Sequence, residues 1–441
     1  GNAGTIKLTG KGSVAYYLKN ANLASNSNFM DALTVNSDDS YVYFYAEDST
    51  LNYENQKTIN NDGTTLIYAK NSDIILKENT NINSVKKNVT ALYSEEAAEK
   101  NVVNKGNMML LGEKSLGIYS KSTHKVENFG NIEVGGKSTA IYAENISDAV
   151  ENKGTIKLAT NSTGISGINS KIRNTADIKS SGTNSGKNIA IYSYGGKEVS
   201  NSGNITLLGN QSVGIYSDSS DVINTGKIVM GDSIDSKNPS IGIYSKNGKV
   251  ENFGELTTGN NSTGIYAKSV NVKENSKLNV GNNSVGIYSL GGDIHLSSAS
   301  QLSVGDNHST LLYYHGKNGN IVNNTDKLTV GNHSNAFTIK GEKNKVESNS
   351  TGTVNLKNDS VYMYSTDSSG SITNKTNITS SGNDNYGIYS FGKVDNYGNI
   401  NFSEGTGSIG IYAYYPKSDP YSLSTLSVSA IPTLTNHSGS T

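Results

Sequence analysis

One six-residue strand motif recurs along the whole chain and constrains its fold more than any other feature. It is Ser-Val-Gly-Ile-Tyr-Ser at Ser212–Ser217 and at Ser284–Ser289, with close copies at Ser138–Ala143, Ser262–Ala267 and Ser408–Ala413. The tyrosine of the motif, or the residue that replaces it, forms a column of 17 members: Tyr17, Tyr45, Tyr68, Tyr93, Tyr119, Tyr142, Ser166, Tyr192, Tyr216, Tyr244, Tyr266, Tyr288, Tyr313, Thr338, Tyr364, Tyr389 and Tyr412. The first and last members are 395 residues apart over 16 intervals, so the mean spacing is 24.7 residues. This period predicts a solenoid, in which each repeat buries its apolar face only against its neighbours.

Each repeat contains three short elements joined by turn residues. The Gly-Ile-Tyr strand precedes an apolar-x-Asn element such as Val126–Asn128, and an apolar-x-apolar strand such as Ile132–Val134 follows. Strands with a period of two and no helical periodicity predict a parallel β-helix. A leucine-rich repeat has a similar period, but its leucine skeleton and helical segment are not found in the repeat. We therefore expect an all-β, right-handed parallel β-helix solenoid of about 17 coils, with three short strands in each coil of ~25 residues.

Alternation along the first strand predicts which columns face the core. The Ile column, the Val, Thr, Ile or Leu column two residues before it and the Ser or Ala column two residues after it are expected inside. That assignment leaves the Gly and Tyr columns outside, and it avoids burying unpaired phenol hydroxyls at roughly 1–3 kcal/mol each. In the second element, Asn-x-Gly predicts a turn in which the Gly takes a positive φ, and stacked Asn side chains suggest an amide ladder.

Composition excludes several classes of protein and site. The chain has no Cys, which removes disulfide scaffolds, thiolate zinc sites and cysteine nucleophiles. Its formal net charge is −1 and Arg173 is its single arginine, so the basic footprint of a nucleic-acid-binding protein is missing. A β-helix enzyme acting on polysaccharides needs outward carboxylates clustered on one sheet, together with a cation. The outward columns expected here are Gly and Tyr, so the sequence predicts no enzyme and no cofactor.

Binding sites in a solenoid are expected where the repeat is interrupted. The first gap is lengthened at Asn20–Ser40 and another at Asp232–Ser240, while Glu95–Lys100 predicts one helical turn. The largest interruption follows Ala413, because the next apolar-x-Asn element is found only at Leu434–Asn436. We therefore expect a continuous β-helix over 1–413, an excursion loop over 414–433 and a resumed β-helix over 434–441.

The aromatic, proline-containing excursion is the predicted partner-binding site. Its candidate binding residues are Tyr412, Tyr414, Tyr415, Pro416 and Tyr421. A solvated loop without function is the alternative. The tyrosine column itself is a rigid amphipathic stripe, suited to sugar or protein contacts, or else a purely structural stack.

Two histidines occupy the same turn column on neighbouring coils. His308 and His333 are 25 residues apart and fall in register between Asn283 and Asp359. They are weak candidates for metal ligands, because two stacked imidazoles can bind a cation. A polar turn ladder in which His replaces Asn is the simpler interpretation.

With the motifs Ser-x-Gly-Ile-Tyr-Ser/Ala and Val-x-Asn-x-Gly-x-Ile-x-Val/Leu-Gly-Asn identified, the chain resembles passenger domains of type V (monomeric) autotransporters. It is most similar to the very large fusobacterial outer-membrane adhesins. The resemblance covers Gly1–Ala413 and resumes near Leu434. Because the chain begins in the middle of a repeat, we expect it to be a fragment of a longer protein.

The resemblance implies an adhesin that is exposed on the bacterial cell surface. The implied partners are a host cell-surface protein receptor or a galactose-type glycan, and other bacteria in coaggregation. It also implies membrane attachment only through a C-terminal barrel outside this sequence. Two alternatives stay open at this point: a purely structural stalk that projects a distal binding head, and a polysaccharide-acting β-helix enzyme.

Overall fold

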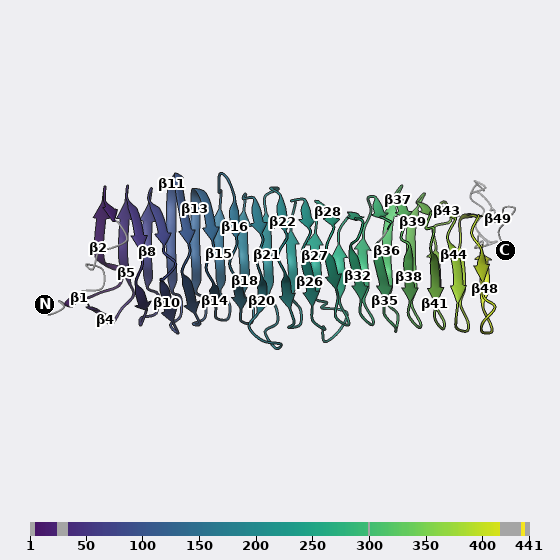
Figure 1. Cartoon of the computed structure of the whole chain (residues 1–441), viewed down its shortest axis with the longest axis horizontal. Helices are drawn as coiled ribbons and strands as arrows, with labels where there is room; N and C mark the ends of the chain where they lie inside the picture. Colours follow the sequence, from purple (N-terminus) through teal and green to yellow (C-terminus); the bar gives the residue numbers. More distant parts are fainter. Residues whose placement is uncertain (1–4, 24–33, 299, 415–433, 437–441) are drawn as a thin grey trace, which may run out of the picture. The chain divides into compact units, whose positions relative to one another are not determined.

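The computed structural model describes residues 5–23, 34–298, 300–414 and 434–436 (Figure 1). Every regular element in these residues is a β-strand, and the strands form a right-handed parallel β-helix of about 16 turns. This confirms the fold predicted from the repeat. The chain divides into two compact units of this fold, unit 1 (Gly1–Val222) and unit 2 (Ile223–Thr441).

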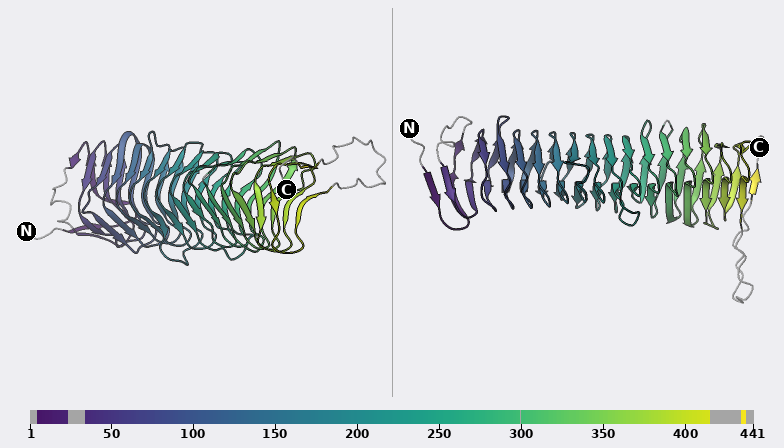
Figure 2. Two further views of the ribbon diagram at one scale, coloured as in Figure 1. Left: turned by 45° about the vertical axis from the view of Figure 1, so that its right-hand side comes forward. Right: turned by 90° about the horizontal axis from the view of Figure 1, so that it is seen from below.

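In unit 1 the strands of each coil stack on those of the next coil (Figure 2), except that β1 and β4 form a sheet of their own, separate from the sheet that begins at β7. The first strands, which carry the tyrosine column, are β2 (Ser13–Lys19), β5 (Tyr41–Glu47), β8 (Thr65–Lys70), β11 (Thr90–Asn104), β13 (Leu116–Asn128), β15 (Thr139–Glu144), β18 (Thr163–Ile168), β21 (Ile189–Tyr194) and β24 (Val213–Ser217). The second strands are β3 (Asn22–Leu23), β6 (Thr50–Tyr53), β9 (Asp73–Leu76), the ends of β11 and β13, β16 (Val150–Asn152), β19 (Ile172–Asn174) and β22 (Val199–Asn201). The third strands are β1 (Thr5–Leu8), β4 (Thr34–Ser37), β7 (Gln56–Thr58), β10 (Asn81–Ser84), β12 (Asn107–Leu110), β14 (Ile132–Val134), β17 (Ile156–Leu158), β20 (Ile178–Ser180) and β23 (Ile205–Leu207).

Unit 2 repeats the same arrangement. Its first strands are β27 (Ile241–Ser245), β30 (Thr263–Tyr266), β33 (Val285–Ser289), β36 (Thr310–Lys317), β39 (Asn335–Glu342), β42 (Val361–Ser365), β45 (Tyr386–Ser390) and β48 (Ile409–Ala413). Its second strands are β25 (Val222–Asn224), which begins at the division between the units, β28 (Lys249–Asn252), β31 (Ser269–Val272), β34 (Ile294–Leu296), β37 (Asn320–Asn323), β40 (Lys345–Ser348), β43 (Ser371–Asn374), β46 (Lys393–Asn396) and β49 (Leu434–Asn436). Its third strands are β26 (Lys227–Met230), β29 (Glu255–Thr257), β32 (Lys277–Val280), β35 (Gln301–Val304), β38 (Lys327–Val330), β41 (Thr353–Leu356), β44 (Asn377–Ser380) and β47 (Ile400–Asn401).

The strand register confirms the tyrosine column, including its two degenerate members. Ser166 pairs with Tyr142 on one side and Tyr192 on the other, and Thr338 lies in the same way between Tyr313 and Tyr364. From Phe44 to Ile388 the Ile column is fully buried, and the tyrosines from Tyr45 to Tyr389 are half-buried with their edges outward, as expected. At the C-terminal end of the described residues β49 pairs with β46, with Asn436 beside Asn396.

The prediction for the two columns before the Ile was wrong. The Gly column faces the core: a Cβ added to Gly117 would lie 3.1 Å from the Ile132 side chain, and Ala140 in this column is fully buried. The aliphatic column is half-exposed on the outer surface, as at Leu116 and Ile189. The Gly-column residue also has no Cα partner in the register, so two consecutive residues face inward at a bend and simple alternation fails there. An aliphatic column therefore lies beside the tyrosines on the outer face.

Tyr362 shows how the inward Gly column can carry a large side chain. It is fully buried, and its hydroxyl lies 2.9 Å from Asn323 Nδ2 and 2.6 Å from Ser348 Oγ. Ser348 stands at a position that Asn fills in most coils, so the phenol occupies the space that the shorter side chain leaves. Burial raises the pKa of Tyr362, and its hydroxyl is satisfied inside the core.

The second strands end in a buried amide ladder, which the sequence suggested. In unit 1, Asn104, Asn128, Asn152 and Asn174 each donate Nδ2–H to the Oδ1 of the asparagine in the next coil at 2.7 Å, and the last acceptor is Asn201. In unit 2 the pairs are Asn224 with Asn252 and Asn374 with Asn396. These side chains are at most 1% exposed, so the ladder is an internal polar seam in an otherwise apolar core.

The glycine two residues after each ladder asparagine does not take a positive φ, contrary to the turn expectation. Close stacking of the coils requires it instead. A Cβ added to Gly130 would lie 1.7 Å from the carbonyl oxygen of Gly106 in the preceding coil, and a Cβ added to Gly154 would lie 1.9 Å from the carbonyl oxygen of Gly130. Positive φ is concentrated in the other turn, at Asn161, Asn261 and equivalent positions. The consensus asparagine before Ser thus suits a left-handed turn.

The helical turn expected at Glu95–Lys100 is also wrong. β11 continues through this stretch as a strand that is interrupted at Glu96, where φ is 51°, and Ala97 is buried and pairs with Thr123. The extra residues are absorbed by a shift of register between Ala97 and Asn101. Hydrogen bonds to both neighbouring coils favour the strand over an isolated helical turn, which has a costly nucleus.

Candidate functional site

From Tyr45 to Tyr142 the tyrosine column of unit 1 forms a continuous stack of rings. Ring centroids are 4.9 Å apart between Tyr45 and Tyr68, 4.6 Å between Tyr68 and Tyr93, and 4.4 Å between Tyr93 and Tyr119. Interplanar angles of 10–11° make these rings nearly parallel. Each ring therefore covers the faces of its neighbours, and within the stack only ring edges are left for a ligand.

The position two residues after each tyrosine alternates in charge along these coils: Glu47, Lys70, Glu95, Lys121 and Glu144. Lys121 and Glu144 pair at 3.1 Å. Tyr68 and Tyr93 both donate their hydroxyls to Glu95, the second at 3.1 Å. Burial, followed by the hydrogen bond to Glu95, raises the pKa of Tyr68. Most of the stack is thus bonded to its own chain and stiffens the face of the β-helix.

The outer face changes character in the last coils of unit 2. Here aromatic residues occupy three neighbouring columns, and together they form what we call the aromatic platform: Tyr386, Tyr389, Phe391, Tyr412 and Tyr414. Tyr389 stacks on Tyr412 at 4.8 Å, and Phe391 lies 5.0 Å from Tyr414. Tyr386 meets Tyr412 edge to face at 6.4 Å.

The platform is broad because aromatic rings replace the aliphatic and charged columns on either side of the tyrosines. Tyr386 is in the aliphatic column, while Phe391 and Tyr414 stand where unit 1 has charged residues. Tyr412 and Tyr414 are 37% and 41% exposed. Burial among the neighbouring rings raises the pKa of Tyr389, so its hydroxyl is a neutral donor and acceptor at physiological pH. A flat apolar surface edged by hydroxyls suits the apolar face of a sugar or a protein side chain.

Two of the binding residues predicted from the sequence belong to this platform, namely Tyr412 and Tyr414. The other three, Tyr415, Pro416 and Tyr421, lie outside the described residues, as does the rest of the predicted excursion loop. Sequence reasoning missed Tyr386 and Phe391. Their signal was available, since each departs from the residue type usual in its column.

The two histidines lie on neighbouring coils of unit 2, as predicted. The His308 amide donates to the His333 carbonyl at 2.7 Å, and both residues have a positive φ, which places them in the left-handed turn column. They line an open pocket of about 430 Å³ with Asp359, whose carboxylate is 2.8 Å from His333 Nδ1. Among the described residues, no group of three or more His, Asp or Glu side chains is placed to hold a metal ion. Their shared place in the left-handed turn column is the arrangement that the turn-ladder interpretation predicts.

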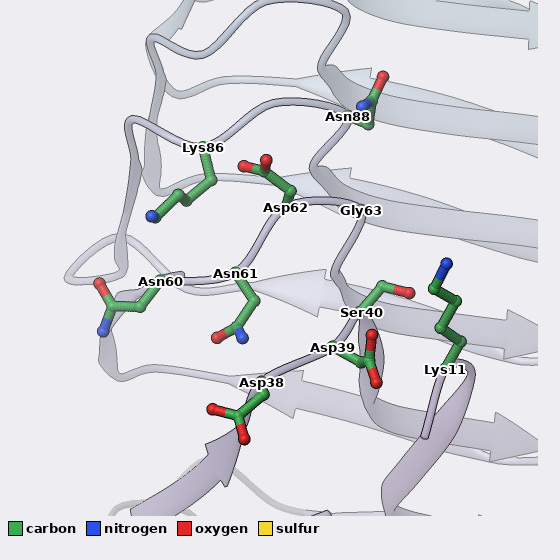
Figure 3. A pocket seen from close by; sticks show the side chains of 10 residues that line it. All are labelled: Lys11, Asp38, Asp39, Ser40, Asn60, Asn61, Asp62, Gly63, Lys86 and Asn88. Carbon is green, nitrogen blue, oxygen red and sulfur yellow. The ribbon is translucent and has the colours of Figure 1, made fainter. Parts of the chain in front are cut away.

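A second open pocket, of about 460 Å³, lies in unit 1 over three successive turns (Figure 3). Asp38 and Asp39 come from the first turn, Asp62 from the second and Lys86 from the third. Asp62 accepts a hydrogen bond from the Lys87 amide at 2.9 Å, so it stabilises the adjacent turn. The side chains in Figure 3 spread over the rim of the hollow and do not converge on a common point.

Unit 1 carries a network of charges on the outer face of its second strands. Glu151 lies 2.8 Å from Lys153, 2.9 Å from Arg173 and 3.3 Å from Lys125, and its side chain is 13% exposed. Hydrogen bonds from Lys153, and then from Arg173 and Lys125, lower the pKa of Glu151 to about 2. The ionised carboxylate is thus favoured by folding.

We expect this network to make unit 1 less stable as the pH falls below about 4.5. The pKa of Glu151 is depressed on folding, so its contribution is present above the unfolded value of 4.5 and is lost as pH falls towards 2. Glu151→Gln should destabilise unit 1 by about 1 kcal/mol at pH 7 and flatten the fall in Tm between pH 4.5 and 2. Thermal unfolding at several pH values checks this. Glu133→Gln, which loses one pair to Lys157 at 3.5 Å, is the control and should change Tm little.

Comparison with known proteins agrees with the repeat and the fold. Residues 99–275 are similar to the BigA third pectate lyase-like domain. The match to the BigA domain covers 177 of the 441 residues. It fits a β-helical protein of the cell-surface adhesin type, and "pectate lyase-like" expresses a relation of fold to an enzyme family. No curated protein and no solved structure matched the chain. Within the described part of the chain, no helix is long and apolar enough to cross a membrane.

Proposed function

We propose that this chain is the binding region of a bacterial cell-surface adhesin and that it holds its receptor on the aromatic platform. The observation that supports this most is the three-column cluster of rings around Tyr389 and Tyr412. Elsewhere in unit 2 the tyrosines stack in a single column, as Tyr266 does between Tyr244 and Tyr288 at 4.8 and 5.2 Å. Exposed aromatic clusters are the usual anchors of protein and sugar recognition.

The partners that we propose are a host cell-surface protein receptor or a galactose-type glycan, and partner bacteria. The similarity to the BigA domain supports a surface adhesin, and the resemblance of the repeat to fusobacterial autotransporter passengers supports this choice of partners. The platform can hold a galactose residue because the apolar face of that sugar stacks on tyrosine while its hydroxyls reach the phenols. That the chain has no enzymatic activity stays a prediction.

Tyr389→Ala is expected to weaken binding of this chain to its receptor at least tenfold, because it removes the central ring of the platform. Binding to host cells, to partner bacteria and to immobilised galactosides gives the measurement. Tyr266→Ala is the matched control, since it removes a ring from the same column with similar stacking but leaves the platform intact. Equal binding by the two variants would contradict the platform.

Deletion of residues 415–431 distinguishes binding by the platform from binding by the excursion loop that the sequence predicts. Binding that survives this deletion and is lost in Tyr389→Ala assigns the site to the platform. Binding lost only in the deletion assigns it to the excursion. If the chain binds none of the three targets, the proposed platform is contradicted and the alternative of a structural stalk is favoured.

A further inference from the structure

The sequence contains two Asn-Gly pairs, Asn247-Gly248 and Asn318-Gly319, and both belong to unit 2. In such a pair the glycine nitrogen can attack the side-chain carbonyl carbon of the asparagine, because glycine has no Cβ to hinder the approach. Each pair follows a lysine and lies between a first and a second strand, the former between β27 and β28 and the latter between β36 and β37. In both pairs the asparagine is exposed and the glycine is buried, so the two can be compared directly.

The Gly319 amide is held in place by the fold. It donates to Asn344 Oδ1 in the next coil at 2.9 Å, and this bond is buried. The Asn318 amide donates to the Glu342 carbonyl oxygen at 2.9 Å. The Tyr314 side chain also packs against Gly319, since a Cβ added there would lie 1.8 Å from the Tyr314 hydroxyl oxygen. The Gly319 nitrogen can therefore reach the Asn318 side chain only after this coil has opened.

The Gly248 amide is not held in this way. Among the residues that the structure describes, its N–H donates no hydrogen bond, and the Asn247 side chain has no hydrogen-bond partner either. The Gly248 carbonyl oxygen accepts from Ser245 Oγ at 2.9 Å, which leaves the nitrogen free. Residues 246–248 form a bend between two strands and are not part of a strand themselves. The attacking nitrogen and the side chain that it would attack are thus both available in the folded chain.

Asn-Ser pairs in the left-handed turns are protected in the same way as Asn318-Gly319. Their serine amide donates to a side-chain oxygen of the next coil, at 2.9 Å from Ser162 to Asn188 and at 3.0 Å from Ser262 to Ser284. The stacking that builds the solenoid therefore also occupies the backbone nitrogen that follows these asparagines. Asn247-Gly248 combines the most reactive type of pair with a glycine nitrogen that the stacking leaves free.

We propose that Asn247 is a site of spontaneous modification, at which this chain deamidates in its folded state while Asn318 stays intact. The Gly248 nitrogen loses its proton and forms a bond to Asn247 Cγ, and the side-chain amide nitrogen leaves as ammonia. Water then opens the succinimide at either carbonyl, which gives aspartate or isoaspartate without an oxidant or a cofactor. The product carries one more negative charge than asparagine does, and isoaspartate adds one methylene to the backbone between β27 and β28.

The test is to incubate the whole folded chain at mildly alkaline pH and to analyse its peptic peptides by mass spectrometry, since acid halts deamidation during digestion. Asn247 is expected to deamidate at least about tenfold faster than Asn318, because the Gly319 amide reacts only from an opened coil. In urea neither glycine amide is held, and both asparagines follow a lysine, so the two rates should become similar. Asn247→Gln should remove most of the isoaspartate that isoaspartyl methyltransferase labels in the folded chain, without changing Tm.

The proposal is overturned if Asn318 deamidates as fast as Asn247 in the folded chain. It is equally overturned if Asn247 stays intact in the folded chain over a time in which urea makes it react. The reaction needs no partner, so either result can be obtained whether or not the aromatic platform binds a receptor.

Discussion

Asn128→Leu is expected to destabilise unit 1 by about 2–4 kcal/mol, because it interrupts the buried amide ladder. The Asn128 side chain is fully buried, accepts from Asn104, and donates to Asn152 and to the Gly130 carbonyl at 2.7 and 2.9 Å. The substitution removes the acceptor of the Asn104 side-chain Nδ2–H and the donor to the Asn152 side-chain Oδ1, both of which lie in the core. Each unpaired group costs about 1–3 kcal/mol.

Leucine is the appropriate replacement because this column already accommodates it. Leu76 pairs with Asn104 at the same register position and is fully buried. The loss of stability in Asn128→Leu therefore reports on hydrogen bonding and not on packing. Amide hydrogen exchange in the neighbouring coils is the most direct measurement, since the coils of a solenoid can open locally.

Asn131→Leu is the matched control for this experiment. Asn131 also belongs to an amide ladder, donating to Asn107 at 3.0 Å, but that ladder is exposed on the outer face. Water replaces the lost partner there, so exchange rates and Tm should change little. Similar losses in the two variants would contradict the importance of burial.

Gly130→Ala is expected to cost unit 1 at least about 3 kcal/mol, because the added methyl group would overlap backbone. Its Cβ would lie 1.7 Å from the carbonyl oxygen of Gly106 and 2.7 Å from the carbonyl carbon. Backbone of the preceding coil cannot rotate away as a flexible side chain can. We expect a large fall in Tm, or failure of the neighbouring coils to form, measured by thermal unfolding and hydrogen exchange.

Gly136→Ala in the same coil should be tolerated. The nearest atom to its added Cβ is 3.4 Å away, and its φ lies outside the left-handed region. A Tm within about 2 °C of the unmodified chain is expected, corresponding to less than about 0.5 kcal/mol. Comparable effects of Gly130→Ala and Gly136→Ala would show that coil-to-coil contact does not constrain Gly130.

The repeat predicted the path of the chain because its period and its buried Ile column follow directly from solenoid stacking. It predicted the wrong face for the Gly and aliphatic columns, because strict alternation cannot describe two consecutive inward residues at a bend. Tyr362 and Leu311 contained the missing signal. They stand in the Gly column, are apolar or aromatic, and are fully buried.

The candidate site could be predicted only in part for a related reason. Tyr412 and Tyr414 were identified because they stand where the repeat ends. Tyr386 and Phe391 join them only through register, which sets the aliphatic, tyrosine and charged columns side by side on the outer face.

The amide ladder of unit 1 also has a direction. Each of its four hydrogen bonds runs from the Nδ2 of one coil to the Oδ1 of the coil that follows it in the sequence. A run of these coils therefore presents an amide N–H towards the coil that follows it and an amide oxygen towards the coil that precedes it. A neighbouring coil offers the complementary half of the pair, an amide oxygen against an amide N–H. The ladder thus distinguishes the two ends of a run of coils, because each end offers only one half of the amide pair.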